Sequence, residues 1–212
     1  MILVIDFDGV LFNDFRFKKD YILLFRRFNV SVKQYQEAYE KSKKSTGGYY
    51  TLERHLEVLE KQYPAVRKTQ IKKETTLFLK KSSHYIYRDS KQFLAYWQRK
   101  KVPVFLTSTG SAFQKEKVNA SGLAHFFKKQ YIIKNPLKLE PLKKILKNAE
   151  SEKIVFIDDK KEVVDEVKKY FPHIFVIQMM RRSSPEKSRK ADYAVKNLAA
   201  TQKICQKILD QK

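Results

Sequence analysis

Short apolar runs alternate with helical patterns along most of the chain, and this alternation constrains the fold more than any other feature. The runs lie at residues 1–5, 102–106, 131–133, 154–157 and 174–177. Helical spacing of apolar residues is found at residues 89–100, 111–120, 139–148, 161–170 and 198–209. Apolar runs without polar alternation are typical of strands buried on both faces of a parallel sheet. The pattern therefore predicts an α/β fold with a Rossmann-like, doubly wound parallel sheet.

Residues 14–88 interrupt this alternation. They are rich in Lys, Glu, Tyr and Phe, with helical periodicity and no clear strand, and Ser31 and Thr51 are suited to cap helices. Their aromatic residues fit the core of a helix bundle better than a surface for stacking bases. We expect roughly four helices inserted after the first strand. The α/β core would then consist of residues 1–13 and 89–212.

Polar side chains follow the predicted strands at one end. They are Asp6 and Asp8, Thr107 and Ser108, Lys138, and Asp158 and Asp159. Ligands of open α/β sheets bind beyond the carboxyl ends of the strands, so we expect these groups to converge. Clustered carboxylates remain ionised when a cation compensates them, and oxygen ligands combined with phosphate suit Mg²⁺. An aspartate can also attack phosphorus covalently, so the set predicts magnesium-assisted phosphoryl chemistry.

The spacing of these residues resembles the haloacid dehalogenase-like superfamily. Residues 5–11 (Ile-Asp-Phe-Asp-Gly-Val-Leu) match its first motif, and residues 104–107 (Val-Phe-Leu-Thr) match the second. Residues 122–127 (Gly-Leu-Ala-His-Phe-Phe) are similar to a segment usual after the second motif. Residues 138–141 (Lys-Leu-Glu-Pro) look like the third motif, and residues 155–159 (Val-Phe-Ile-Asp-Asp) match the fourth. The inserted helices stand where this superfamily has a helical cap.

The resemblance implies a role for each residue of the first two motifs. Asp6 would be the nucleophile that forms an aspartyl-phosphate. Asp8 would protonate the leaving group and then activate water, and an Asp at this position favours a phosphatase over a dehalogenase. Thr107, with Ser108, would bind the phosphoryl oxygens.

The third motif depends on a single lysine. Lys138 would neutralise charge on the phosphoryl group and on Asp6. Lys134 is its rival, because the proline that usually follows the lysine is replaced by Leu139.

The resemblance also implies the ligands of Mg²⁺. They would be Asp6, Asp158, the backbone carbonyl of Asp8, and Asp159 either directly or through water. Asp158 and Asp159 can also cap the following helix while they bind the metal.

The chain is strongly basic, with 45 Lys and Arg residues against 23 Asp and Glu and a net charge of +22. Such a charge attracts polyanions. The basic residues are spread along the whole length, however, and this is also typical of a surface whose charges only keep the protein soluble. Three functions stay open: a phosphatase of a small metabolite such as a nucleotide or sugar phosphate, a nucleic-acid end-phosphatase, or a non-catalytic protein that binds RNA or ribosomes.

The remaining sequence features concern location. The single cysteine, Cys205, excludes an internal disulfide and fits a reducing cytoplasm. Acidic residues interrupt the apolar start and no basic leader precedes it, so we expect no signal peptide. No apolar run approaches the length of a membrane span. The oligomeric state is left open.

Overall fold

A computed structural model describes residues 1–147, 149, 152–181 and 186–211 of the chain. Its sheet has six parallel strands in the order β3-β2-β1-β4-β5-β6. The strands are β1 (Ile2–Asp6), β2 (Val104–Thr109), β3 (Lys129–Ile133), β4 (Ile154–Asp158), β5 (Phe175–Met179) and β6 (Tyr193–Val195). The predicted doubly wound α/β fold is confirmed, with a sixth short strand that the sequence pattern did not predict.

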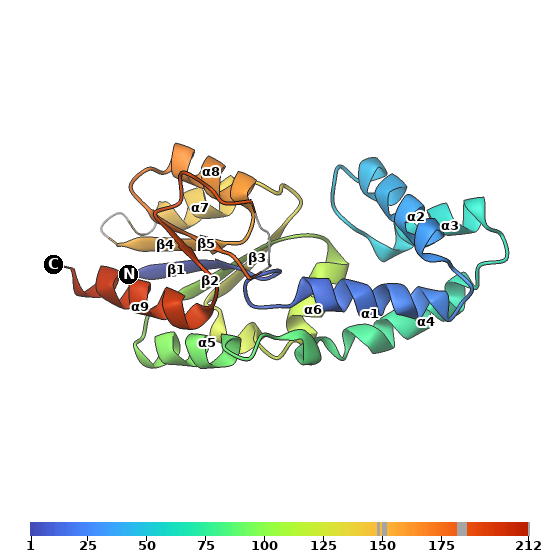
Figure 1. Cartoon of the computed structure of the whole chain (residues 1–212), viewed down its shortest axis with the longest axis horizontal. Coiled ribbons are helices and arrows are strands. Elements are labelled where there is room, and N and C mark those ends of the chain that lie inside the picture. The colour runs from blue at the N-terminus through green and yellow to red at the C-terminus, as the bar shows by residue number, and fades with distance from the viewer. Residues whose placement is uncertain (148, 150–151, 182–185, 212) are drawn as a thin grey trace.

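The helices of the α/β core cover both faces of the sheet (Figure 1). They are α5 (Ser90–Arg99), α6 (Ala112–Ala120), the 3₁₀ turn η2 (Ala124–Phe126), α7 (Leu139–Leu146), α8 (Lys161–Tyr170) and α9 (Leu198–Asp210). The predicted positions agree within a few residues; residue 148, the predicted end of the helix after β3, lies outside the described residues. Because alternate side chains of a strand point to opposite faces, β1 contributes to two cores. Ile2 and Val4 pack with α7 and α8, whereas Leu3 and Ile5 pack with α5 and α9.

A helical insert separates β1 from α5. It comprises α1 (Asp14–Arg26), α2 (Val32–Ser45), α3 (Leu52–Gln62), α4 (Lys68–Leu79) and the 3₁₀ turn η1 (Ser82–Tyr85). The predicted caps are confirmed: Ser31 forms a capping box with Gln34, and Thr51 accepts a hydrogen bond from the Arg54 backbone N–H. Buried aromatic side chains, including Tyr21 and Phe25, form the interior of the insert.

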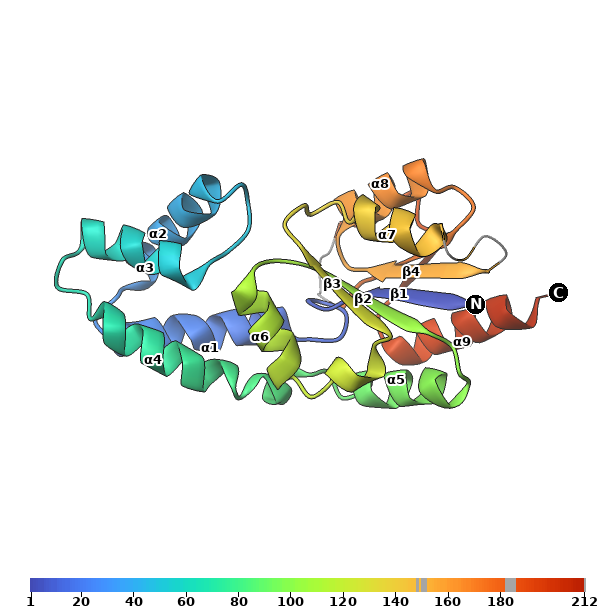
Figure 2. The ribbon, with the colours of Figure 1, turned by 180° about the vertical axis from the view of Figure 1, so that it is seen from behind.

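The two chain segments that join the insert to the core hydrogen-bond to each other. The Asn13 N–H donates to the Tyr85 carbonyl at 2.7 Å, and the Tyr87 N–H donates to the Leu11 carbonyl at 3.0 Å. Figures 1 and 2 show α1 and α4 extending away from the sheet, with the α2–α3 pair at their far end. The insert therefore begins and ends beside the loop that follows β1.

Across the described residues, no helix is both long enough and apolar enough to cross a bilayer.

Candidate active site

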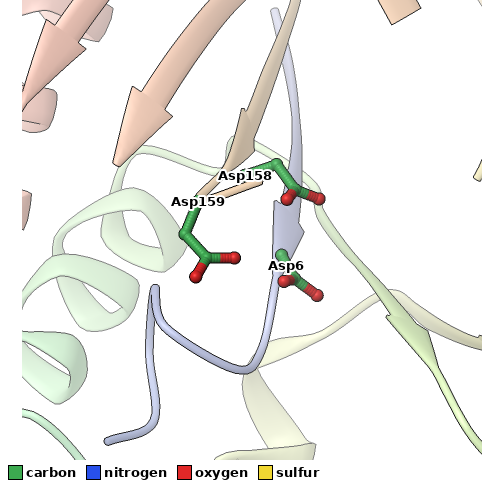
Figure 3. A group of neighbouring side chains, drawn as sticks. All are labelled: Asp6, Asp158 and Asp159. Atoms are coloured by element: carbon green, nitrogen blue, oxygen red, sulfur yellow. The ribbon is translucent and has the colours of Figure 1, made fainter. Parts of the chain in front are cut away.

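The carboxyl ends of three neighbouring strands bring the predicted side chains together. Strand β1 lies between β2 and β4, with Asp6 in register with Thr107 and Ile5 in register with Ile157. Because the strands are parallel, Asp158 ends beside Asp6 (Figure 3). The structure thus brings residues far apart in the sequence to one edge of the sheet, as expected.

Lys138, and not Lys134, reaches this edge. The Lys138 Nζ lies 2.6 Å from Asp6 Oδ1 and 2.7 Å from Asp158 Oδ2, and the residue is only 1% exposed. It has a left-handed backbone, with φ of 58°, immediately before α7. The ammonium group of Lys134 instead lies 5.2 Å from the centre of the Tyr49 ring.

Burial and crowding perturb the titration of this ion-paired cluster. Burial raises the pKa of Asp6 to about 7, with the Asp158 charge acting in the same direction and Lys138 opposing it. Burial alone would lower the pKa of Lys138, but Asp158 and Asp6 together hold it above its usual value. The lysine is therefore a fixed positive charge between two carboxyl groups.

Asp159 completes an acidic cluster. Carboxylate oxygens of Asp6, Asp158 and Asp159 lie within 4.8 Å of one another. Burial, and then the charges of Asp6 and Asp158, raise the pKa of Asp159 to about 8. Its Oδ1 atom is buried without a hydrogen-bond partner among the described residues. Three converging carboxyl groups with an unsatisfied oxygen fit a hard divalent cation.

The turn after β1 depends on Gly9 for its approach to this cluster. Gly9 has φ of +75°, and a Cβ atom there would overlap the Asp159 carboxylate. The predicted capping of α8 by Asp158 or Asp159 is wrong, because the N-cap residue is Lys160 and no side chain forms a cap hydrogen bond there. Asp158 Oδ1 instead accepts a hydrogen bond from the Lys160 N–H at 2.9 Å, just before the helix.

The two hydroxyl residues of β2 that the sequence predicts to bind phosphate, Thr107 and Ser108, differ in their surroundings. The Thr107 Oγ1 atom is buried and has no hydrogen-bond partner in the described part of the chain. The Ser108 Oγ atom accepts a hydrogen bond from Gln114 Nε2 at 2.8 Å. An unpartnered buried hydroxyl beside Asp6 is suited to bind an oxygen of a ligand.

Asp8 faces α6 instead of the acidic cluster. Lys117 Nζ lies 2.7 Å from its Oδ1 and 2.9 Å from its Oδ2, and Gln114 Nε2 lies 2.8 Å from its Oδ2. The cluster of converging oxygens does not include the Asp8 side chain. Gln114 and Lys117 were not among the predicted site residues. Their spacing of three residues puts them on one face of a helix, but nothing in the sequence distinguishes Lys117 from the other lysines.

The parallel α/β sheet thus carries an aspartate-lined site at its carboxyl edge. The profile of the haloacid dehalogenase-like hydrolases matches residues 1–164, and the chain belongs to this family. No protein with curated annotation matches the sequence significantly.

Solved structures share this fold over nearly the whole chain. A haloacid dehalogenase-like hydrolase from Burkholderia xenovorans LB400 is 18% identical, with a TM-score of 0.78 over 99% of this chain and 98% of its own. The L-2-haloacid dehalogenase of Xanthobacter autotrophicus with chloropropionic acid covalently bound is 15% identical, with a TM-score of 0.57 over 97% of this chain and 99% of its own. A β-phosphoglucomutase-like protein from Thermotoga maritima is 16% identical, with a TM-score of 0.64 over 98% of this chain and all of its own. The fold is thus shared by proteins described as a dehalogenase and as a β-phosphoglucomutase.

Proposed function

We propose that this hydrolase is a magnesium-dependent phosphatase that cleaves phosphomonoesters through an aspartyl-phosphate on Asp6. The observation that carries the proposal is the second carboxyl group, Asp8, two residues after Asp6 and 27% exposed at its side chain. A halide leaves carbon without a proton, whereas an alkoxide leaving group needs one from a neighbouring acid. A site that presents a separate, partly exposed acid beside the nucleophile suits phosphate esters.

The proposed reaction has two covalent steps. In the first, an Asp6 oxygen bonds to phosphorus, the ester P–O bond breaks, and the leaving oxygen takes a proton from Asp8. In the second, Asp8 takes a proton from water, the water oxygen bonds to phosphorus, and the bond from phosphorus to Asp6 breaks. Lys138 offsets the negative charge of Asp6 before the attack and that of the phosphoryl group in the intermediate, and the unpartnered Thr107 hydroxyl donates to a phosphoryl oxygen.

The acidic cluster would hold the metal. Asp6, Asp158 and Asp159, with the Asp8 backbone carbonyl, supply the hard oxygen ligands that Mg²⁺ prefers. Bound Mg²⁺ would stabilise the negative charge that builds up on the phosphoryl oxygens.

The helical insert supports a small substrate. The insert joins the core beside the loop that carries Asp8, which is where a lid over this site would be attached. A lid restricts the access of large molecules to the site. We therefore infer a small phosphorylated metabolite, such as a nucleotide or sugar phosphate. The net charge of +22 favours a second candidate, an end-phosphatase of nucleic acids, and a non-catalytic RNA-binding role would use the same charge.

Phosphate release from metabolites and from 5′- and 3′-phosphorylated oligonucleotides tests the proposal. Turnover should require Mg²⁺ and fall by about a thousandfold or more in Asp6→Asn. It should persist in Asp210→Asn, which makes the same change at the last residue of α9. Acid-quenched peptide mapping should find the phosphoryl group on Asp6. An active Asp6→Asn variant would refute the mechanism, and an inactive wild type that binds RNA would favour the non-catalytic role.

A further inference from the structure

Helix α6 carries two buried polar side chains that point at one carboxylate. Gln114 and Lys117 are three residues apart and each is only 5% exposed. Gly110 allows the close approach of this helix to β2, since a Cβ atom there would lie 2.9 Å from Gln114 Cγ. The helix follows β2, the strand that contains Thr107 and Ser108.

The donors of α6 hold both oxygens of Asp8. Lys117 contacts the two oxygens at 2.7 and 2.9 Å, and Gln114 contacts Oδ2 at 2.8 Å. The same Gln114 nitrogen also donates to Ser108 Oγ at 2.8 Å, so one amide joins Asp8 to the end of β2. Three hydrogen bonds from one rigid helix fix both the position and the plane of the Asp8 carboxylate.

An aromatic cage encloses the Lys117 ammonium group. Its Nζ lies 5.7, 4.9 and 5.2 Å from the ring centres of Phe7, Phe12 and Phe17. Within the described part of the chain, the carboxylate at ion-pair distance from Lys117 Nζ is that of Asp8. A buried ammonium group requires such a partner, and the cage leaves it too little exposure to bind a substrate directly.

The insert takes part in this cage. Phe17 belongs to α1, and Phe113 of α6 packs on Tyr21 and Tyr50 with ring centres 5.6 and 5.0 Å apart. The helix that holds Asp8 is thus packed against the insert as well as the sheet.

We propose that Lys117, assisted by Gln114, is the positioning residue for Asp8. Lys138 holds Asp6 from one side of the site, and Lys117 holds the proposed proton carrier from the other. The inference rests on the proposed function, because it assigns Lys117 to act through Asp8 and not on the substrate.

A double-mutant cycle with 4-nitrophenyl phosphate tests this role. Its leaving group needs no proton, so the first release of 4-nitrophenolate stays measurable in an Asp8→Asn background. Lys117→Met should lower kcat of the wild type for an alkyl phosphate by roughly tenfold to a hundredfold, with KM changed less than about twofold. With 4-nitrophenyl phosphate, Lys117→Met should lower steady-state turnover, because the second step still needs Asp8 to activate water. It should change the first release of 4-nitrophenolate by less than about twofold, in the Asp8 and the Asp8→Asn backgrounds alike.

Two variants complete the design. Lys115→Met makes the same change at an exposed position of α6 and should leave kcat unaltered. If Lys117→Met does not fold, as judged by circular dichroism, Gln114→Leu enters the same cycle. It should show a smaller loss of turnover, with the first release of 4-nitrophenolate again unchanged in either background.

The outcomes separate this inference from the proposed function. Equal losses of the first 4-nitrophenolate release in the Asp8 and Asp8→Asn backgrounds would show a merely structural role and overturn the inference, as would a Lys117→Met variant as active as the wild type. A folded wild type that hydrolyses no phosphate ester in Mg²⁺ would refute the proposed function and, with it, the role of Lys117.

Discussion

Acidification should destabilise the helical insert through one buried histidine. His55 of α3 is fully buried, with Nε2 3.2 Å from the Tyr35 carbonyl oxygen and Nδ1 3.1 Å from the Tyr50 hydroxyl. A carbonyl oxygen only accepts, so Nε2 carries the proton and Nδ1 accepts from Tyr50. The Tyr50 hydroxyl then accepts from Tyr21, at 3.2 Å, and Tyr21 accepts from Thr75, at 3.3 Å. This chain of donors fits a neutral imidazole.

The size of the effect follows from the pKa of His55. Burial lowers this pKa from 6.5 to about 4, and the hydrogen bond to Tyr35 opposes burial in part. Because the folded pKa is the lower one, the unfolded chain binds more protons between these values. The contribution to stability is complete above pH 6.5 and is lost as the pH falls toward 4. Near pH 5 the loss should be about 2 kcal/mol, rising to about 3 kcal/mol near pH 4.

Urea unfolding of the wild type and of His55→Gln measures this loss. Glutamine keeps a donor for the Tyr35 carbonyl but does not titrate, and the titration of Asp6 and Asp159 cancels in the difference between the two proteins. The stability advantage of the wild type over His55→Gln should shrink by about 2 kcal/mol between about pH 7.5 and 5. An advantage that stays constant over this range would refute the buried neutral histidine.

Two substitutions in the site should have separable effects. Gly9→Ala should destabilise the protein by at least about 1 kcal/mol and weaken Mg²⁺ binding, because the new Cβ displaces the Asp159 carboxylate. Gly47→Ala is its control: φ is +77° there and nothing lies within 4 Å, so isothermal titration should show unchanged Mg²⁺ affinity, and equal weakening in both variants would contradict the reasoning. Lys138→Met should destabilise by about 3–5 kcal/mol in chelator, because it leaves two buried carboxyl groups without their cation. Lys134→Met should change the unfolding free energy by less than about 0.5 kcal/mol, and an equally mild Lys138→Met would count against the buried ion pairs.

The α/β core could be predicted because its strands are continuous apolar runs. Strand β1 is buried along its whole length, so the run at the start of the sequence marks it directly. Strand β6 was missed because it has three residues, of which Tyr193 and Ala194 are exposed, and such a segment has no apolar run. Its pairing with β5 is a tertiary effect that local pattern does not encode.

The candidate site could be predicted only where residues follow strands. Asp6 and Asp158 end their strands, and Thr107 of β2 lies in register with Asp6, so their convergence followed from the topology alone. Lys117 lies inside a helix, and one lysine among 45 basic residues carries no signal of its own. Its position beside Asp8 results from the packing of α6 against the loop that follows β1 and against the insert, which depends on long-range contacts.

Burial, together with the charges gathered at the site, raises the pKa values of Asp6 and Asp159. Four carboxyl groups, Asp6, Asp8, Asp158 and Asp159, face two buried ammonium groups, Lys117 and Lys138. If all six were ionised, the net charge would be −2. Two of the acids have a raised pKa, about 7 for Asp6 and about 8 for Asp159, which corresponds to this excess. A single divalent cation would neutralise it.

Mg²⁺ binding should therefore release protons. Near pH 7, Asp6 is about half protonated and Asp159 mostly protonated, so binding that ionises both should release between about one and two protons. Near pH 9.5 both acids are already ionised, so the release should fall to about zero and the affinity for Mg²⁺ should be higher. Calorimetric titration in buffers of different ionisation enthalpy measures the number released. Asp159→Asn should lose most of the release at pH 7, because it removes the acid with the higher pKa. Proton release that is absent at pH 7, from a protein that binds Mg²⁺ at this cluster, would show that the carboxyl groups are already ionised and that Lys117 and Lys138 suffice to balance them.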